Sequence, residues 1–392
     1  MREINTIFLR PGKEKPVLNR HPWIFSGAVA RIDDGAADGS IVSVRDASGR
    51  HIGYGYYNGR SRINVRMLSF GDRFPDRDHL HHLMIVARDK RRSSGVISRT
   101  NAWRAVFSEG DFLPGLIADS YDGHLVIQIL TLGIERMREN IIGLLAEIFS
   151  PSSIYERSDH AGRSIEGLSD RIGQVTGSTP EEIPIVENGL NYIVDVHRGQ
   201  KTGFFIDQRE NRALVARIAA GRSALNLFSY TGGFSIAALA GGALEAVSID
   251  VSEPALTMAR RNAGLNALED RSAFIAADAF EYLRDNVLPH DLIIIDPPAF
   301  AKNKESVPSA CRGYKEINLQ AVKKCPAGSL ILTCSCSRFI GMDLFQKVVF
   351  GAASDAGRSV SILYAGQHPA DHPVSVFCPE TSYLKSLLLH VD

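Results

Sequence analysis

The sequence predicts an α/β protein whose C-terminal half is a Rossmann-like domain built on a mostly parallel, seven-stranded sheet. From about residue 206, short apolar runs alternate strictly with helical patterns, and this alternation is typical of parallel sheets covered by helices. The last two runs resemble a hairpin. The runs lie near residues 223–228, 244–250, 272–277, 291–295, 328–334, 359–364 and 381–388.

The front half is predicted to hold two further domains, since 392 residues exceed one typical hydrophobic core. Residues 1–72 alternate short β-type runs with Gly and Asp turns, a pattern typical of a small β-barrel. Residues 73–187 mix a basic helical segment, short strands and an amphipathic helix, which predicts an α+β middle domain. Residues 188–392 remain for the Rossmann-like domain.

The composition is that of an ordinary globular protein, with 44% hydrophobic and 22% charged residues. No run of about 18 apolar residues occurs, and the first ten residues lack the apolar core of a secretion signal. We therefore expect a cytoplasmic protein with no membrane partner. The five cysteines show no Cys-x-x-Cys spacing, and the histidine groups at 78–82 and 368–373 bring no recognised set of ligands. These patterns predict reduced thiols and no metal site.

The formal net charge is zero, yet the charges are unevenly distributed along the chain. Residues 1–110 hold 19 Lys and Arg against 11 Asp and Glu, whereas the rest of the chain holds 25 against 33. A basic front module suits the capture of a phosphate backbone. An Arg-rich surface that only keeps the protein in solution is the alternative.

The ends of the first three predicted strands offer groups suited to a nucleoside. The first strand leads into a Gly turn at the start of a helix, where the backbone can approach a ligand closely. The second ends at Asp250, which can accept hydrogen bonds from two ribose hydroxyls. The third ends at Asp278 and Phe280, an acid for the edge of adenine and a ring for its face. The predicted contact residues are Phe228, Ser229, Tyr230, Thr231, Gly232, Gly233, Asp250, Val251, Ser252, Asp278, Ala279 and Phe280.

This set of residues predicts S-adenosylmethionine as the cofactor, because that molecule has an adenosine and no phosphate. The Gly-x-Gly-x-x-Gly fingerprint of dinucleotide sites is absent, and so is a third glycine for a pyrophosphate. Tight turns between strands and helices, with no ligand, are the remaining alternative.

Asp296-Pro297-Pro298 follows the fourth predicted strand. Because prolines donate no backbone hydrogen bond, the turn offers carbonyls and a carboxylate as acceptors for an amino group of a substrate. Enzymes that methylate exocyclic amines share the motif but usually place an aromatic residue directly after the prolines, where this chain has Ala299. Asp296 and Pro297 are also expected to border the cofactor, and a purely structural turn is the alternative.

The fifth predicted strand ends with two thiols, Cys334 and Cys336. Carbon 5 of a pyrimidine is too weak a nucleophile to accept a methyl group unaided, so a thiolate must first add to carbon 6. Both cysteines share one side of an extended chain, and Cys336 lies two residues nearer the open end of the sheet. We therefore predict Cys336 as the nucleophile and Asp296 as the holder of the base edge. A small buried hydrophobe is the alternative for either cysteine.

Five longer motifs occupy residues 21–27 (HPWIFSG), 53–58 (GYGYYN), 108–117 (SEGDFLPGLI), 156–159 (ERSD) and 200–212 (QKTGFFIDQRENR). With them, essentially the whole chain resembles the bacterial large-subunit ribosomal RNA 5-methylcytosine methyltransferases that carry an N-terminal PUA domain. The resemblance implies a class I methyltransferase domain behind a PUA domain that binds RNA, with large-subunit ribosomal RNA as the partner. It also implies that the last motif lines the cofactor cleft through Lys201, Phe205, Asp207, Gln208 and Arg209.

Two alternatives to cytosine methylation stay open in the sequence. Related enzymes methylate guanine at nitrogen 7 without a cysteine, and a non-catalytic RNA-binding protein would need only the PUA surface. On the PUA domain, Trp23 is expected to face either RNA or the domain core. The base that removes the proton from carbon 5 is unassigned, and the formation of a homodimer is left open.

Overall fold

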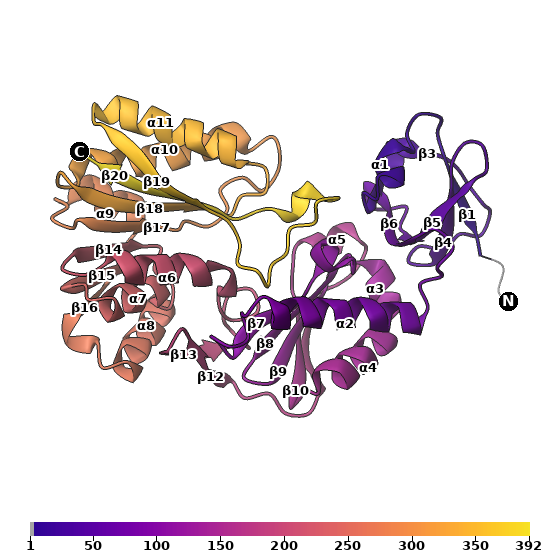
Figure 1. Cartoon of the computed structure of the whole chain (residues 1–392), viewed down its shortest axis with the longest axis horizontal. Coiled ribbons are helices and arrows are strands. Elements are labelled where there is room, and N and C mark those ends of the chain that lie inside the picture. Colours follow the sequence, from indigo (N-terminus) through magenta and orange to yellow (C-terminus); the bar gives the residue numbers. More distant parts are fainter. Residues whose placement is uncertain (1–3) are drawn as a thin grey trace. The chain divides into compact units, whose positions relative to one another are not determined.

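The computed structural model describes residues 4–392, and contacts along the chain define two units (Figure 1). The first unit comprises the chain up to Ile183 together with Val194–Phe204 and Ala370–Thr381. The second unit comprises Pro184–Ile193, Phe205–Pro369 and Ser382–Asp392. The chain therefore returns to the first unit near its C-terminus. Among the described residues, no helix is both long enough and apolar enough to cross a lipid bilayer.

The N-terminal part of the first unit is a six-stranded sheet, which confirms the small β domain predicted there. Its elements are β1 (Thr6–Leu9), α1 (Lys15–Leu18), β2 (Trp23–Phe25), η1 (Ser26–Ala28), β3 (Val29–Ile32), β4 (Ile41–Arg45), β5 (His51–Tyr57) and β6 (Ile63–Phe70). The strands pair in the order β2-β6-β5-β4-β1-β3. Gly53 and Gly55 lie where β5 approaches β6 closely. A Cβ atom on Gly53 would lie 2.3 Å from the Ser69 carbonyl oxygen, so the pairing requires glycine there.

The rest of the first unit is the α+β part that the sequence predicts between the two outer domains. Its strands pair in the order β11-β10-β9-β8-β7. Its main elements are α2 (Arg77–Ser93), β7 (Ala102–Phe107), η2 (Ser108–Asp111), β8 (Leu116–Tyr121), β9 (His124–Ile129), α3 (Leu132–Arg136), α4 (Arg138–Phe149), β10 (Ser153–Ser158), α5 (Gly162–Ile165) and β11 (Arg171–Thr176). Because contacts group this part with the N-terminal sheet, the division of the chain into three domains stays a prediction.

Some of the basic charge of the front half is used inside the first unit. Arg91 and Arg104 are buried and pair with Asp111 and Asp119 at 2.7 and 2.8 Å. The C-terminal return of the chain completes this network, because the Arg91 guanidinium and the Arg104 amide both donate hydrogen bonds to Asp371. These two arginines stabilise the fold and are not part of a surface for phosphates.

Trp23 is buried, with 8% of its surface exposed. Its indole N–H donates a hydrogen bond to the Glu109 carboxylate at 2.7 Å. Of the two alternatives that the sequence leaves open for this ring, RNA or the protein interior, its burial favours the interior.

The second unit contains a seven-stranded sheet with the strand order β16-β15-β14-β17-β18-β20-β19. The strands are β14 (Ser223–Leu227), β15 (Glu245–Asp250), β16 (Ser272–Ala276), β17 (Leu292–Ile295), β18 (Ser329–Ser335), β19 (Val360–Gly366) and β20 (Lys385–Val391). All neighbours pair in parallel except β20, which is antiparallel to both β18 and β19. The predicted Rossmann-like fold and its final hairpin-like pair are confirmed.

Helices cover both faces of this sheet (Figure 1). They are η3 (Ile206–Gln208), α6 (Arg209–Ile218), α7 (Gly233–Ala240), α8 (Glu253–Leu265), η4 (Glu269–Arg271), α9 (Ala279–Asp285), α10 (Val307–Lys324) and α11 (Met342–Ala356). Helices α9, α10 and α11 share one apolar core with the central strands. A hairpin of β12 (Glu182–Glu187) and β13 (Leu190–Asp195) docks on α8, where Asn262 and Asn266 accept hydrogen bonds from its backbone.

The last strand begins four residues later than predicted, at Lys385 instead of residue 381. The chain before it forms the 3₁₀ turn η5 (Pro379–Thr381). The backbone amides of Tyr383 and Leu384 both donate hydrogen bonds to the His368 ring at 2.9 Å. These two amides are therefore not available for the hydrogen-bond ladder with β18, which begins after them.

Candidate active site

The predicted site residues follow the carboxyl ends of five neighbouring parallel strands. Asp278, Asp250 and Asp296 come at or just after the ends of β16, β15 and β17, and Cys336 follows β18. The Gly turn after β14 lies between them in the strand order. Because parallel strands end at one edge of a sheet, the topology gathers these groups where open α/β sheets bind ligands.

The turn after β14 holds an unusual backbone. Phe228 and Tyr230 adopt left-handed conformations, with φ of 60° and 47°, which cost about 1–3 kcal/mol each for residues other than glycine. The Asp250 carboxylate holds the turn in place by accepting a hydrogen bond from the Tyr230 amide at 2.8 Å. Gly232 has a φ of 80°, and α7 begins at Gly233. A Cβ atom on Gly232 would lie 3.0 Å from the side chain of Ala259, so the turn packs tightly against α8.

Asp250 keeps acceptor capacity for a ligand. Its two oxygens accept one backbone amide each, from Tyr230 and from Ser252. Since a carboxylate offers about four acceptor positions, this leaves room for the two hydroxyls of a ribose. The next side chain, Val251, is 71% exposed, which places an apolar surface beside the carboxylate. Within the same turn, the hydroxyl of Ser229 is buried and has no hydrogen-bond partner among the described residues.

Asp278 and Phe280 lie at the start of α9. Asp278 caps the helix, because its Oδ1 accepts hydrogen bonds from the amides of Phe280 and Glu281. Ala279 is buried, whereas the Phe280 ring is half-buried and meets the Phe228 ring edge to face at 6.3 Å. The two rings form an aromatic wall that suits one face of an adenine.

The segment 201–212 contributes two kinds of residue. Phe205 and Gln208 reach the site: the Phe205 ring lies 5.2 Å from that of Tyr230, and the Gln208 amide donates to Asp296 at 2.8 Å. Arg209 is completely buried and forms an ion pair with Glu187 at 3.5 Å, and its contact with the cofactor stays a prediction.

Two further residues of this segment were predicted to line the cofactor cleft. Asp207 is buried and accepts a hydrogen bond from the Tyr383 hydroxyl at 2.6 Å. Lys201 belongs to the first unit, so its contact with the cofactor stays a prediction.

The two thiols differ in their surroundings. Cys336 is half-buried, and its sulfur lies 3.8 Å from the Pro297 carbonyl oxygen, next to Asp296. Cys334 is completely buried, and burial, followed by the negative charge of Asp296, raises the pKa of its thiol well above the usual value. A buried thiol of raised pKa is a poor nucleophile, so Cys336 is the better placed of the two.

Lys385 is a residue that the sequence reasoning missed. It is buried at the start of β20, and its Nζ donates hydrogen bonds to the carbonyls of Ser337 and Tyr383, each at 2.7 Å. Burial lowers the pKa of Lys385 to about 8, and the nearby Cys336 partly offsets this shift. The signal in the sequence was a single charge within the largely apolar run 384–389 (LKSLLL).

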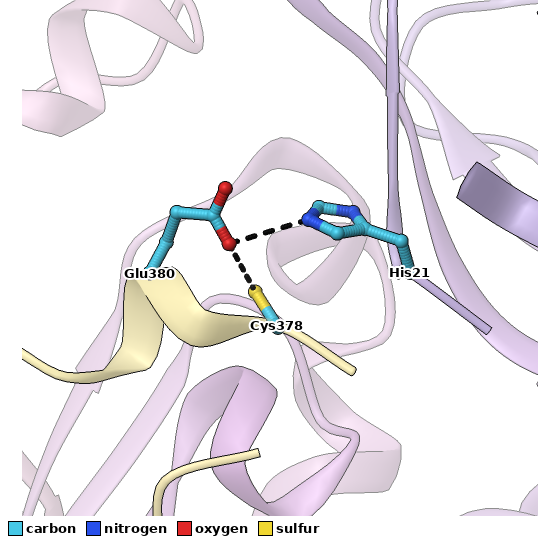
Figure 2. Close-up of side chains that lie close together, drawn as sticks. All are labelled: His21, Cys378 and Glu380. Carbon is cyan, nitrogen blue, oxygen red and sulfur yellow. Dashed lines mark hydrogen bonds and ion pairs between the residues drawn. The ribbon is translucent and has the colours of Figure 1, made fainter. Parts of the chain in front are cut away.

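Three potential metal ligands meet in the first unit (Figure 2). His21 Nε2 lies 3.2 Å from a Glu380 oxygen, and the Cys378 sulfur lies 3.5 Å from the same oxygen. However, His21 Nδ1 accepts a hydrogen bond from the Trp23 amide at 3.1 Å. A neutral imidazole in this position carries its proton on Nε2, which then donates to Glu380 and has no lone pair for a metal. We therefore interpret this cluster as a structural contact that holds the returning segment, Ala370–Thr381, on the N-terminal sheet.

Comparisons with known proteins show which family the chain resembles. The model of S-adenosylmethionine-dependent methyltransferases matches residues 169–374, and the model of PUA-like domains matches residues 7–70. The ribosomal RNA large subunit methyltransferase I of Aeromonas salmonicida is 42% identical over 389 residues, which cover 98% of each chain. The protein of the same name from Escherichia coli (strain SMS-3-5) is 39% identical over 391 residues, which cover 98% of this chain and 99% of that one.

Among solved structures, a putative methyltransferase complexed with SAH superposes with a TM-score of 0.85 at 25% identity, covering 99% of this chain and 100% of that chain. The fold and the site thus define a methyltransferase that uses S-adenosylmethionine and carries a PUA-like domain. The chain belongs to the ribosomal RNA large subunit methyltransferase I family. The residues present fit the cofactor, because the Asp250 carboxylate suits a ribose and the two aromatic rings suit an adenine.

Replacing Asp250 with Ala is expected to weaken the binding of S-adenosylmethionine about tenfold to a hundredfold. The substitution removes a charged acceptor worth about 1.5–3 kcal/mol and also frees the Tyr230 amide that fixes the turn. Isothermal calorimetry measures the change. Asp270→Ala, on the exposed turn η4, is the matched control and should bind like the parent protein. An unchanged affinity in Asp250→Ala would contradict the assignment of Asp250 to the ribose.

Proposed function

We propose that this protein methylates carbon 5 of a cytosine in large-subunit ribosomal RNA through a covalent bond between Cys336 and carbon 6 of the base. The observation that carries the proposal is the accessible thiol of Cys336 beside the Asp296-Pro297 turn, at the same edge of the sheet as the cofactor turn. Cys334, which is completely buried, could not reach a base without a rearrangement of the strand.

The chemistry follows from these positions. The cofactor supplies an electrophilic methyl group. The Cys336 thiolate adds to carbon 6, and the electron pair displaced from the carbon 5–carbon 6 bond makes carbon 5 nucleophilic enough to take that methyl group. Asp296, which the Gln208 amide orients at 2.8 Å, accepts a hydrogen bond from the amino group of the cytosine. A base then removes the proton from carbon 5, and the sulfur leaves carbon 6 as a thiolate.

The substrate class rests on the relatives and on the front half of the chain. The curated relatives are named for the large-subunit ribosomal RNA, and a PUA-like domain precedes the catalytic unit. This domain carries exposed cations, which suit a phosphate backbone and predict affinity that falls as salt rises. They are Arg10, Lys13, Lys15, Arg20, Arg31, Arg50, Arg60 and Arg62. Such a substrate implies a cytoplasmic enzyme. A homodimer stays a prediction, which the mass of the protein in solution would check.

Nucleoside analysis tests the proposed product. Purified protein is expected to transfer a labelled methyl group from S-adenosylmethionine to ribosomal RNA extracted from cells that lack the gene, and digestion should yield 5-methylcytidine. RNA from cells that have the gene is the control, because its target base is already modified. Labelled 7-methylguanosine would contradict the cytosine proposal and favour methylation of guanine. Binding of RNA without any methyl transfer would favour a non-catalytic role.

A further inference from the structure

Lys385 has the position of a partner for the Cys336 thiol. Lysine is almost never fully buried unless a nearby group compensates its charge, yet Lys385 is only 4% exposed. In the ladder between β18 and β20, Lys385 pairs with Ser335, the residue directly before Cys336. Its hydrogen bond to the Ser337 carbonyl holds the residue directly after Cys336. Residue 385 is therefore tied to both sides of the thiol, through its backbone register to Ser335 and through its ammonium group to Ser337.

The hydrogen bonds of Lys385 leave capacity for one more interaction. An ammonium group has three N–H donors, and the carbonyls of Ser337 and Tyr383 accept two of them. The negative charge that acts on Lys385 comes from Cys336. A thiolate at Cys336 would therefore compensate the buried cation, and the cation would in turn stabilise the thiolate.

Other titratable groups surround the thiol. Tyr314 of α10 feels the charge of Cys336, and burial raises the pKa of its hydroxyl, so it stays neutral. Cys334 and Asp296 lie on the neighbouring chain segments and offer only neutral or negative charge. Of the groups named here, Lys385 is the one cation.

We propose that Lys385 is a positioning residue that keeps Cys336 as a thiolate, an inference that rests on the proposed function. In this step the S–H bond of Cys336 breaks, a new N–H bond forms on the neutral amine of Lys385, and the sulfur keeps the electron pair that attacks carbon 6. The ammonium group of Lys385 stays beside the sulfur while the sulfur is bonded to carbon 6. It stabilises the Cys336 thiolate again when the product leaves.

The test measures the reactivity of the thiol itself in the full-length protein, without RNA or methyl donor. Iodoacetamide labels cysteines at a rate set by their thiolate fraction, and mass spectrometry of the Cys336 peptide gives that rate from about pH 6 to about pH 10. In the parent protein we expect a profile with two steps, because two coupled groups lose their protons in turn. Half-buried Cys311 serves as an internal reference.

Two substitutions of Lys385 give opposite signatures. Lys385→Met should slow the labelling of Cys336 about tenfold near pH 7, because the thiolate loses the neighbouring positive charge that stabilises it. The labelling profile of this variant should show a single step, at higher pH than in the parent protein. Lys385→Arg keeps the charge but cannot lose its proton, so it should leave one step at lower pH. Lys324→Met is the matched control, because Lys324 also donates to backbone carbonyls, those of Leu283, Arg284 and Asn286 at the end of α9.

The outcomes separate this inference from the proposed function. Identical labelling profiles in the parent protein, Lys385→Met and Lys385→Arg would overturn the role of Lys385, whatever the RNA assays show. A profile that shifts as expected, combined with full RNA methylation by Cys336→Ala, would leave the ion pair in place but reject the covalent mechanism. If Lys385→Met does not fold, Lys385→Arg still tests the inference, because arginine keeps the positive charge and has N–H donors for the two carbonyls.

Discussion

Cys336→Ala is expected to abolish methyl transfer, lowering the rate on the order of 10⁴-fold or more, and to prevent any covalent complex with RNA. Removing a nucleophile leaves only the binding and orientation of the reactants, and such losses in other enzymes are of this order. RNA that carries 5-fluorocytosine makes the complex visible. Fluorine cannot leave carbon 5 as a proton does, so the adduct formed after methyl transfer should persist and migrate slowly on a denaturing gel.

Cys334→Ala is the matched control for this experiment. Cys334 lies two residues before Cys336 on the same strand, but it is completely buried. The adduct should persist in Cys334→Ala and should require S-adenosylmethionine. The reverse dependence would move the nucleophile to Cys334. Full activity of both variants without an adduct would eliminate thiol catalysis and favour the guanine alternative.

Glu187→Gln is expected to destabilise the second unit by about 3–5 kcal/mol, because it leaves buried guanidinium groups without a compensating charge. Glu187 is 2% exposed and pairs with Arg212 through two hydrogen bonds of 2.6 and 2.7 Å and with Arg209 at 3.5 Å. Burial lowers the pKa of Arg212, but the charge of Glu187, its hydrogen bond and the nearby Tyr192 and Asp207 together raise the pKa above its usual value. Urea denaturation followed by circular dichroism gives the free energy of unfolding.

The control is Glu181→Gln, which removes one partner of an exposed ion pair with Arg198. Exposed pairs contribute little to stability, so this variant should unfold at the same urea concentration as the parent protein. A similar unfolding midpoint for both variants would show that the Glu187 network contributes no more than a surface pair. A large loss confined to Glu187→Gln would assign Arg209 and Arg212 to stability and not to ligand binding.

The fold could be predicted from the sequence because each strand of the large sheet is a short, nearly continuous apolar run. β17, for example, is Leu292-Ile-Ile-Ile295, buried throughout, as expected for a parallel strand covered on both faces. The candidate site followed from the same pattern, since polar residues at the ends of parallel strands must meet at one edge. For this reason Asp250, Asp296 and Cys336 could be singled out before any coordinates were known.

Other features depend on pairings that spacing does not reveal. The contact of Lys385 with the segment around Cys336 requires the antiparallel register of β20 on β18, and a lone lysine in a strand gives no sign of its partner. The ion pair of Arg209 with Glu187 likewise joins two segments whose contact cannot be read from their sequence patterns. Trp23 was ambiguous for a similar reason, because its partner Glu109 lies 86 residues away in the sequence.

The return of Ala370–Thr381 to the first unit bears on how the protein is made. During synthesis, the guanidinium of Arg91 and the amide of Arg104 gain their acceptor, Asp371, only after strands β14–β19 of the large sheet have been translated. The N-terminal half therefore cannot finish folding until the catalytic half has been translated. A chain truncated before residue 371 would lack both β20 of the large sheet and the acceptor of two hydrogen bonds in the first unit, so a single truncation would weaken both units.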